Sequence, residues 1–257
     1  MAMRADAPRP PSRSDVLVGL LGHRIAYSAS PAMQNAAFRA AGLDDWSYEL
    51  FDVAPEDLAP AVAALRLPDR AGANVTIPHK LAVVPLLDEC DDLATRVGAV
   101  NFIRRDGARL IGGNTDVAGI QAALAEVGWK GGHAVILGRG GSARAAAVAL
   151  EGSEIEFVSR DNWEERGARS RAADLVVNCT PIGRGGEAVI RPADLPRQAV
   201  VDLVYARGGT PLTASAKAAG LPFADGWAVL VAQGAASFTG WTSLPAPFAA
   251  MRAALAT

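Results

Sequence analysis

The segment VILGRGGSARAAA, residues 135–147, constrains the fold of this chain more than any other. An apolar run is followed at once by glycines and then by an alanine-rich run, which predicts a strand, a tight turn and a helix. Gly138, Gly140 and Gly141 allow the sharp turn and let a pyrophosphate approach the main-chain amides, where the helix N-terminus favours negative charge. The GxGG spacing differs from the commoner GxGxxG, so the motif alone is also compatible with a strand–helix turn that binds no ligand.

The segments after this motif continue the alternation of strand and helix. Strands are predicted at HAVILG, IEFVSR, DLVVNCT and AVVDLVY, and helices at GGSARAAAVALE and TPLTASAKAAG. This rhythm is typical of a doubly wound nucleotide-binding domain, in which a parallel sheet carries helices on both faces.

The first half of the chain shows a separate α/β pattern. Strands are predicted at DVLVGLLG, SYELFDV and GANVTI, with a hairpin in AVNFIRRDGARLIGGN that turns at Asp106-Gly107. Helices are predicted at 30–42 with Ser30 as N-cap, at 54–66 with a possible split at Pro60, at 80–98 with a possible break at Pro85, and from 228 onward.

Composition narrows the class of protein. The chain has 257 residues, of which 50% are hydrophobic and 20% charged, and its formal net charge is -2. No global field therefore attracts nucleic acid or an anionic membrane, and no apolar run is long enough to span a bilayer. Residues 1–15 are rich in proline and arginine and lack the apolar stretch of a secretory signal. We expect a disordered tail there and a cytoplasmic protein.

Cysteine and histidine spacing gives no sign of a metal site or a disulfide framework. Cys90 and Cys179 are more typical of small buried hydrophobes. The three histidines, His23, His79 and His133, lack metal-ligand spacing. We therefore expect no metal.

Two charged residues follow predicted strands at places where chemistry is possible. Lys80 ends the segment NVTIPHK, and Asp116 lies in GGNTDVAG before a predicted helix. Taken alone, Lys80 is typical of a solvated surface charge and Asp116 of a helix N-cap. The tyrosine–lysine dyad of short-chain dehydrogenases and the GxSxG elbow of hydrolases are both missing from the sequence.

The end of the second nucleotide-domain strand bears on the choice of dinucleotide. Arg160 follows FVS there and is a fitting partner for the 2′-phosphate of NADP, whereas Asp161 could accept the ribose hydroxyl of NAD. The alternative interpretation is that Arg160 and Asp161 form a solvated ion pair on a loop and bind no cofactor. We weigh Arg160 above Asp161 and predict NADP preferred, with detectable NAD activity.

Eight segments together resemble the shikimate dehydrogenase family, in the family's order and over nearly the whole chain after residue 15. They are GLLGHRIAYSASPAMQNAAF, GANVTIPHK, VGAVNFI, GGNTDVAG, ILGRGGSARA, VVNCTPIG, VDLVYARGGTPL and ADGWAVLVAQGAASFTGW.

The resemblance implies two α/β domains with the active site in the cleft between them. Residues 16–116, completed by helices in 227–257, would form the substrate domain, and 117–226 a Rossmann-like NADP domain. The implied activity is the reversible NADPH-dependent reduction of 3-dehydroshikimate to shikimate, in aromatic amino acid and chorismate biosynthesis. The implied partners are this small molecule and NADP, in a monomer or homodimer that binds neither nucleic acid nor membrane.

The resemblance also implies residue roles, each at the matching position of this sequence. Lys80 and Asp116 would form the catalytic pair. The substrate carboxylate would be bound by Ser28, Ser30 and Tyr205, and the ring hydroxyls by Thr76, Asn101, Asp116 and Gln233. The cofactor would contact Gly138, Arg139, Gly140, Gly141 and Ser142 at its pyrophosphate, Ser159 and Arg160 at its 2′-phosphate, and Thr180, Leu203 and Gly226 at its nicotinamide.

The sequence departs from the family pattern at Tyr27, Gln34, Arg139 and Val229. These departures leave the catalytic pair intact but keep quinate and aminoshikimate open as alternative substrates. The S-x-S pair favours shikimate over branches that carry S-x-T. A different class, a nucleotide-binding sensor with a degenerate site, is disfavoured because Lys80, Asp116 and Asn101 are all present.

Overall fold

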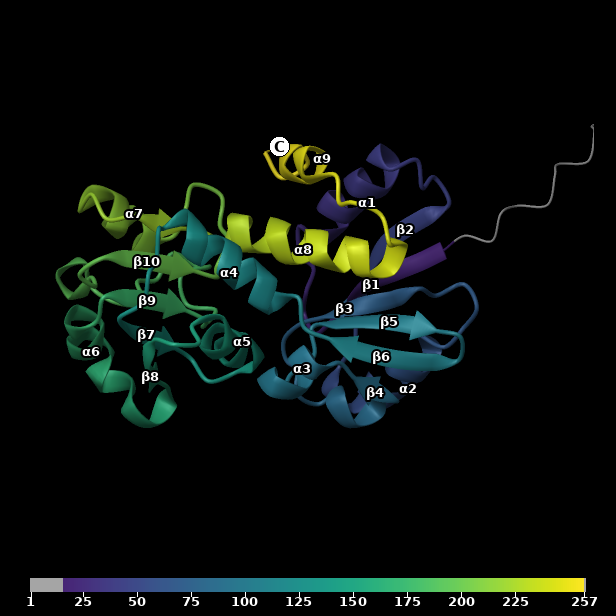
Figure 1. The fold of residues 1–257 in the computed structure, drawn as a ribbon, viewed down its shortest axis with the longest axis horizontal. Coiled ribbons are helices and arrows are strands. Elements are labelled where there is room, and N and C mark those ends of the chain that lie inside the picture. The colour runs from purple at the N-terminus through teal and green to yellow at the C-terminus, as the bar shows by residue number, and fades with distance from the viewer. Residues whose placement is uncertain (1–15, 257) are drawn as a thin grey trace, which may run out of the picture.

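The computed structural model describes residues 16–256, and the tail predicted at 1–15 lies outside this range. Within it, the first half of the chain builds one β-sheet and the second half another, and the two lie beside each other (Figure 1). The predicted pair of α/β units is therefore confirmed. No helix in this range has both the length and the apolarity needed to cross a membrane.

The first sheet has six strands in the order β2-β1-β3-β5-β6-β4. Strand β1 pairs in parallel with β2 and β3, and β5 and β6 form the predicted antiparallel hairpin. The strands are β1 (Val16–Gly22), β2 (Trp46–Asp52), β3 (Gly72–Val75), β4 (Glu89–Cys90), β5 (Phe102–Asp106) and β6 (Arg109–Gly113). Its helices are α1 (Ser30–Ala40), α2 (Leu58–Ala64) and α3 (Asp92–Val97).

The second sheet has five parallel strands in the order β11-β10-β9-β7-β8. The strands are β7 (His133–Leu137), β8 (Glu154–Val158), β9 (Leu175–Asn178), β10 (Ala199–Asp202) and β11 (Phe223–Ala224), and the helices are α5 (Gly141–Ala149), α6 (Arg166–Ala172) and α7 (Pro211–Ala218). The strand order reverses between β7 and β9, so loops of opposite direction leave the sheet there. Such a switch point is where doubly wound sheets bind ligands.

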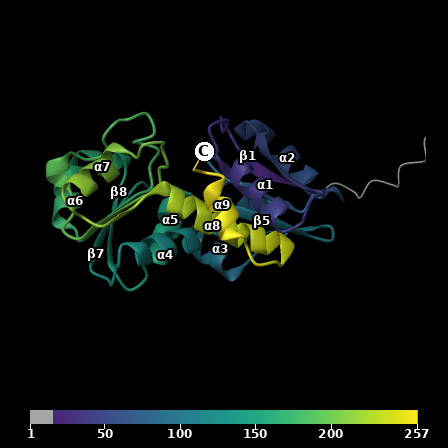
Figure 2. The same cartoon turned by 90° about the horizontal axis from the view of Figure 1, so that it is seen from above.

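Two helices join the sheets, α4 (Asp116–Glu126) and α8 (Gly226–Thr242). They lie side by side between the sheets, and α9 (Phe248–Ala253) packs on α1 beyond them (Figures 1 and 2). A Cβ atom on Gly119 would lie 2.9 Å from the carbonyl oxygen of Val229. The missing side chain at Gly119 is therefore what allows α4 and α8 to approach so closely.

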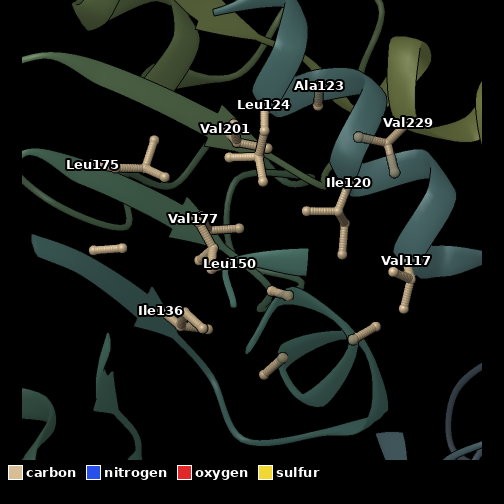
Figure 3. Packing of buried hydrophobic residues seen from close by; sticks show 14 of the residues in the cluster. Val117, Ile120, Ala123, Leu124, Ile136, Leu150, Leu175, Val177, Val201 and Val229 are labelled. Atoms are coloured by element: carbon tan, nitrogen blue, oxygen red, sulfur yellow. The ribbon is translucent and has the colours of Figure 1, made fainter. Parts of the chain in front are cut away.

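The core of the second half forms where α4 covers the sheet. Ile120 and Leu124 of α4 face Ile136, Leu175 and Val177 of the strands, and all five are buried (Figure 3). Burying one such side chain contributes about 1.5–3 kcal/mol relative to leaving it in water. The continuous apolar runs in the sequence follow from this burial on both sheet faces, because a second cluster covers the opposite face.

The helix predicted at 80–98 is largely wrong. Turns, the 3-10 segment Val84–Leu86 and strand β4 occupy most of this stretch, and only α3 is α-helical. Pro85 lies inside the 3-10 segment, where its ring suits a short turn better than a continuous helix. Helix α3 begins late because the Asp91 side chain caps it by accepting from Ala94 N at 2.7 Å.

Three smaller helix predictions also need correction. Ser30 is the first residue of α1, and Ala29 occupies the N-cap without a side-chain hydrogen bond. The break in 54–66 falls between the 3-10 helix Pro55–Asp57 and α2, so Pro60 lies in the first turn of α2, where proline is tolerated. Asp116 is likewise the first helical residue of α4, because Thr115 holds the N-cap position.

Candidate active site

A pocket lies at the carboxyl ends of strands from both sheets. Residues after β1 and β3 line one side, residues after β9 and β10 line the other, and α8 with the start of α4 completes the walls. The polar and charged lining residues are Tyr27, Ser28, Ser30, Asn74, Thr76, Lys80, Asn101, Asp116, Ser142, Thr180, Arg184, Tyr205 and Gln233.

The centre of the pocket holds a nearly buried ion pair. Lys80 Nζ donates to Asp116 Oδ2 at 2.5 Å, and each side chain is only 11% exposed. Lys80 Nζ also donates to Ser142 Oγ at 3.0 Å, across from the first sheet to the start of α5. A Cβ atom on Gly141 would lie 3.0 Å from Lys80 Cβ. This glycine therefore leaves space for the lysine as well as for a turn.

Asn101 holds the other oxygen of the carboxylate. Its Nδ2 donates to Asp116 Oδ1 at 2.8 Å, while its Oδ1 accepts from the backbone N of Thr115 at 2.6 Å. Asp116 lies at the first position of α4, where the helix dipole favours a negative charge. The carboxylate is thus fixed in orientation and points one oxygen at the lysine.

A buried network of hydrogen bonds holds the backbone of Asn101 in place. Asn74 Nδ2 donates to the carbonyl oxygen of Asn101 at 3.1 Å and to Ser237 Oγ at 2.8 Å. Tyr48 donates its hydroxyl to Asn74 Oδ1 at 3.0 Å, and burial raises the pKa of Tyr48 above its ordinary value. The phenol therefore stays protonated and remains a donor. The network ties strands of the first sheet to α8, which rigidifies the pocket floor.

One end of the pocket gathers hydroxyl groups. Ser28 Oγ accepts from the backbone N of Ser30 at 3.2 Å, and Tyr205 approaches from the opposite wall. Burial raises the pKa of Tyr205, with an opposing effect from its hydrogen bond with Ser28. The guanidinium carbon of Arg184 lies 3.8 Å from the Tyr27 ring centroid and 6.0 Å from that of Tyr205.

Thr76 and Gln233 lie between that end and the ion pair. Thr76 directly follows β3, and its backbone N donates to the carbonyl oxygen of Leu21 at 2.9 Å. Gln233 Nε2 donates to the carbonyl oxygen of Leu230, one turn earlier in α8, at 2.9 Å. Their side chains reach the same pocket from opposite walls, so they could contact neighbouring groups on one ring.

The glycine loop after β7 has the geometry expected of a phosphate-binding turn. Gly138 has φ +116°, a conformation that side chains strongly disfavour. Gly140 is the N-cap of α5, and within the described residues no side chain caps this helix. A Cβ atom on Gly140 would meet nothing within 4 Å, so the loop surface is open. The amides at this helix start are available to an anion.

The end of β8 carries the residues predicted to choose the dinucleotide. Arg160 is exposed, and its side chain makes no hydrogen bond or ion pair with residues 16–256. Asp161 instead pairs with Arg139 of the glycine loop at 3.7 Å, although both side chains are largely exposed. Ser159 caps the following turn together with Asn162, whose Oδ1 accepts from Ser159 N at 2.8 Å.

Comparisons with known proteins decide the family. The model of the shikimate dehydrogenase substrate binding domain matches residues 20–103, and that of the shikimate 5′-dehydrogenase C-terminal domain matches residues 226–256. A shikimate dehydrogenase (NADP(+)) from Moorella thermoacetica is 42% identical over an alignment of 268 positions that covers 91% of this chain and 90% of that protein. The chain belongs to the shikimate dehydrogenase family.

Solved structures of the family and of a related enzyme share the fold. Shikimate 5-dehydrogenase from Thermus thermophilus, in complex with NADP(H) and shikimate, has a TM-score of 0.82 at 35% identity and covers 93% of this chain and 98% of its own. Quinate dehydrogenase from Corynebacterium glutamicum, in complex with NAD, has a TM-score of 0.83 at 28% identity, covering 94% and 99%. The predicted two-domain α/β fold class is confirmed.

Every family position predicted for catalysis or substrate binding lines this one pocket. Of the predicted cofactor residues, Ser142, Thr180, Leu203 and Gly226 line it too. The others lie outside it, on the segments after β7 and β8 and at the first residue of α5, and they are Gly138, Arg139, Gly140, Gly141, Ser159 and Arg160. The individual roles stay predictions.

The family motifs did not predict several features of the pocket. Arg184 lines it, although the only signal was its position directly after the TPIG block. Ser142, predicted at the pyrophosphate, is a hydrogen-bond partner of Lys80. Cys179 also lines the pocket, and burial raises the pKa of its thiol above the ordinary value. Within residues 16–256 no group of side chains is arranged to hold a metal ion.

Proposed function

We propose that this chain is an NADP-dependent shikimate dehydrogenase that interconverts 3-dehydroshikimate and shikimate. The observation that carries the proposal is the Lys80–Asp116 ion pair, which lies in a pocket shared by both sheets and adjoins the start of α5. Membership of the family supports it, because curated relatives at 39–42% identity carry the name shikimate dehydrogenase (NADP(+)).

The proposal assigns one half of the molecule to each ligand. Residues 16–116 with 227–257 form the substrate domain, and residues 117–226 form the NADP domain. Two observations support these boundaries: the two sheets divide near Asp116, and α8 contributes Leu230 and Phe238 to the core of the first half. A cytoplasmic location and a monomeric or homodimeric state belong to the same proposal, and light scattering of the purified chain tests the second.

The ring of the substrate fits the pocket with its carboxylate toward Ser28, Ser30 and Tyr205. Its hydroxyls then reach Thr76, Asn101 and Gln233, and the reacting carbon faces Lys80. This orientation separates the anionic group from the Lys80–Asp116 pair, so that the ammonium remains directed at the oxygen where charge develops.

The cofactor fits the residues on the second half. The open glycine loop after β7 and the uncapped start of α5 suit a pyrophosphate, since a side chain at Gly138 would disfavour its φ of +116°. Bound NADPH supplies the hydride. Arg160 is an unpaired cation at the end of β8, which suits a 2′-phosphate, while Asp161 is already paired with Arg139. That pairing weakens the competing reading in which Asp161 binds the ribose of NAD.

Lys80 performs the proton chemistry. During reduction, its ammonium stabilises the negative charge that develops on the substrate oxygen and donates a proton to it. In the reverse direction Lys80 takes the proton back. Asp116 holds the ammonium by its contact at 2.5 Å, and Asn101 holds Asp116, so two residues fix the donor before the substrate arrives.

A side-by-side rate assay tests the proposal. Purified protein is assayed with shikimate and with quinate, each with NADP+ and with NAD+, and kcat/KM is compared. The highest value is expected for shikimate with NADP+. Quinate is the second candidate because the quinate dehydrogenase shares the fold at a TM-score of 0.83. A higher kcat/KM with quinate, or tight NADP binding without turnover of either acid, would contradict the proposal.

A further inference from the structure

Three charged side chains line the pocket, and only two of them form an ion pair. Lys80 and Asp116 compensate each other at 2.5 Å. The third charged side chain on the pocket wall is Arg184, whose guanidinium makes no hydrogen bond or ion pair with residues 16–256. The pocket therefore presents one uncompensated positive charge to an entering ligand, and this charge does not belong to the ion pair that we assign to catalysis.

The position of Arg184 links that charge to one end of the pocket. Its guanidinium carbon lies 3.8 Å from the Tyr27 ring centroid and 6.0 Å from the Tyr205 ring centroid. Tyr27 directly precedes Ser28, and Tyr205 shares the hydroxyl cluster with Ser28 and Ser30. The cation thus lies near the hydroxyl end of the pocket.

Without Arg184, a carboxylate bound at the hydroxyl end of the pocket would meet no positive charge there. Serine and tyrosine hydroxyls donate hydrogen bonds to a carboxylate but leave its charge uncompensated, which is costly away from bulk water. A guanidinium supplies both the charge and a planar fork of donors that matches a carboxylate. Stacking on the Tyr27 face uses the plane of the guanidinium and leaves its N–H edge free for an acceptor.

We propose that Arg184 is a substrate-binding and specificity residue, which pairs with the carboxylate of a cyclic hydroxy acid at the hydroxyl end of the pocket. The proposal rests on the function proposed above, because it concerns the same substrate. Arg184 comes from the loop after β9, whereas Tyr27 and Ser28 follow β1. The contact therefore joins the two halves of the molecule through the substrate, and recognition of the acid requires both.

The test compares Arg184→Gln with Arg207→Gln. Arg207 is exposed, lies two residues after Tyr205 and does not line the pocket, so both variants remove one positive charge from the same region. Arg184→Gln should raise KM for shikimate about ten- to hundredfold, the range for losing a charged hydrogen-bond partner, with kcat and KM for NADP+ changed less than threefold. Arg207→Gln should behave as wild type, and Arg184→Lys should recover part of the loss.

The methyl ester of shikimate isolates the carboxylate. Wild type should prefer the acid over the ester in kcat/KM, and Arg184→Gln should lose most of that preference while Arg207→Gln keeps it. Rising ionic strength should lower kcat/KM for shikimate in wild type and much less in Arg184→Gln. An acid-to-ester ratio within twofold of wild type would overturn the proposal. So would a loss confined to KM for NADP+, which would assign Arg184 to the cofactor.

Direct titration separates this proposal from the proposed function. Wild type that turns over no shikimate overturns the function, whereas active wild type with an unchanged Arg184→Gln overturns only the role of Arg184. Calorimetric titration of shikimate into both proteins covers the inactive case. The role of Arg184 is overturned there if wild type fails to bind shikimate or binds it no more tightly than Arg184→Gln.

Discussion

Lys80 and Ser142 meet across the two halves of the protein, with the ammonium nitrogen 3.0 Å from the serine hydroxyl oxygen. Lys80 follows β3 of the first sheet, and Ser142 is the second residue of α5 in the second. The residue that we assign to proton transfer is therefore positioned partly by the helix that we assign to the cofactor.

Ser142→Ala tests this contact. If Ser142 orients Lys80, kcat should fall by about threefold to tenfold, consistent with the loss of one hydrogen bond of roughly 0.5–1.5 kcal/mol, and KM for NADP+ should change little. A serine that binds the pyrophosphate would give the opposite split, with KM for NADP+ raised and kcat kept. Steady-state kinetics in both substrates distinguishes the two roles, and Ser142→Thr should recover part of the lost rate.

Lys80→Ala and Asp116→Asn should each lower kcat by about 100-fold or more, because each removes part of the proton-transfer pair. Both should remain folded, as judged by circular dichroism and thermal unfolding. Lys130→Ala is the control, since Lys130 is exposed and does not line the pocket. Near-normal kcat with shikimate and NADP+ in either pocket variant would remove that residue from the mechanism.

Gly138→Ala and Gly140→Ala should separate folding from cofactor binding. Gly138 has φ +116°, so alanine there strains the backbone and should lower the unfolding free energy by about 1–2 kcal/mol. Gly140 has φ -79° and open space around its Cβ position, so Gly140→Ala should keep its melting temperature. It should nevertheless raise KM for NADP+, because the methyl group occupies the surface where we expect the pyrophosphate. Unchanged KM for NADP+ in Gly140→Ala would exclude this loop surface as the phosphate site.

Arg160→Ala should reduce the preference for NADP+ over NAD+. One charge-assisted contact of about 1.5–3 kcal/mol corresponds to a preference of roughly ten- to hundredfold. Arg139→Ala frees Asp161 from its ion pair and should reduce the same preference by a smaller factor. The measurement is kcat/KM for both cofactors at saturating shikimate, with Arg207→Ala as control. A wild-type ratio in favour of NAD+ would assign the ribose to Asp161 instead.

Asp194 should stabilise the fold in a pH-dependent way. Hydrogen bonds from Arg191, with the charges of Arg191 and Arg171, hold the pKa of its buried carboxyl below the usual range. A lowered pKa in the folded state means that the stabilisation is present above the unfolded pKa of about 3.9 and is lost as pH falls through the folded value.

Asp194→Asn should therefore lower the melting temperature at pH 7 by several degrees, and the difference from wild type should shrink as the pH falls below about 4. Thermal unfolding between pH 7 and pH 3 measures it. Asp44→Asn, at an exposed position, should show no such trend. A difference that grows toward low pH would contradict the direction of the pKa shift.

The strands were predictable because their signal is local. Val135, Ile136 and Leu137 are buried on both faces of the sheet. A short, continuous apolar run that ends at a glycine is typical of such a strand, so the sequence predicted it correctly. The stretch 80–98 misled because Leu81, Val84 and Leu87 repeat at a helical spacing, while Pro78 and Pro85 and the pairing of β4 with β6 favour turns. The spacing of apolar residues within one segment does not reveal with which distant segment it will pair as a strand.

The pocket residues that the sequence predicted are those that belong to a family segment. Lys80, Asp116 and Asn101 each belong to a family segment and lie together. Contacts between segments were not predictable: Asp161 reaches Arg139 because β7 and β8 are parallel neighbours whose ends meet at one edge. Arg184 reaches Tyr27 because two loops from different sheets face the same pocket.

The packing of α8 and α9 against α1 brings the end of the chain into the core of the first half. Gln34 of α1 donates to the carbonyl oxygen of Gly234 in α8, 200 residues later, and Phe238 and Met251 complete the core around Phe38. During synthesis the first half therefore lacks part of its interior until α8 and α9 have emerged. Every strand of the second sheet, in contrast, comes from one continuous stretch that ends before α8. The second half therefore has all the strands of its sheet before α8 is made, and α8 then adds Val229 to its core.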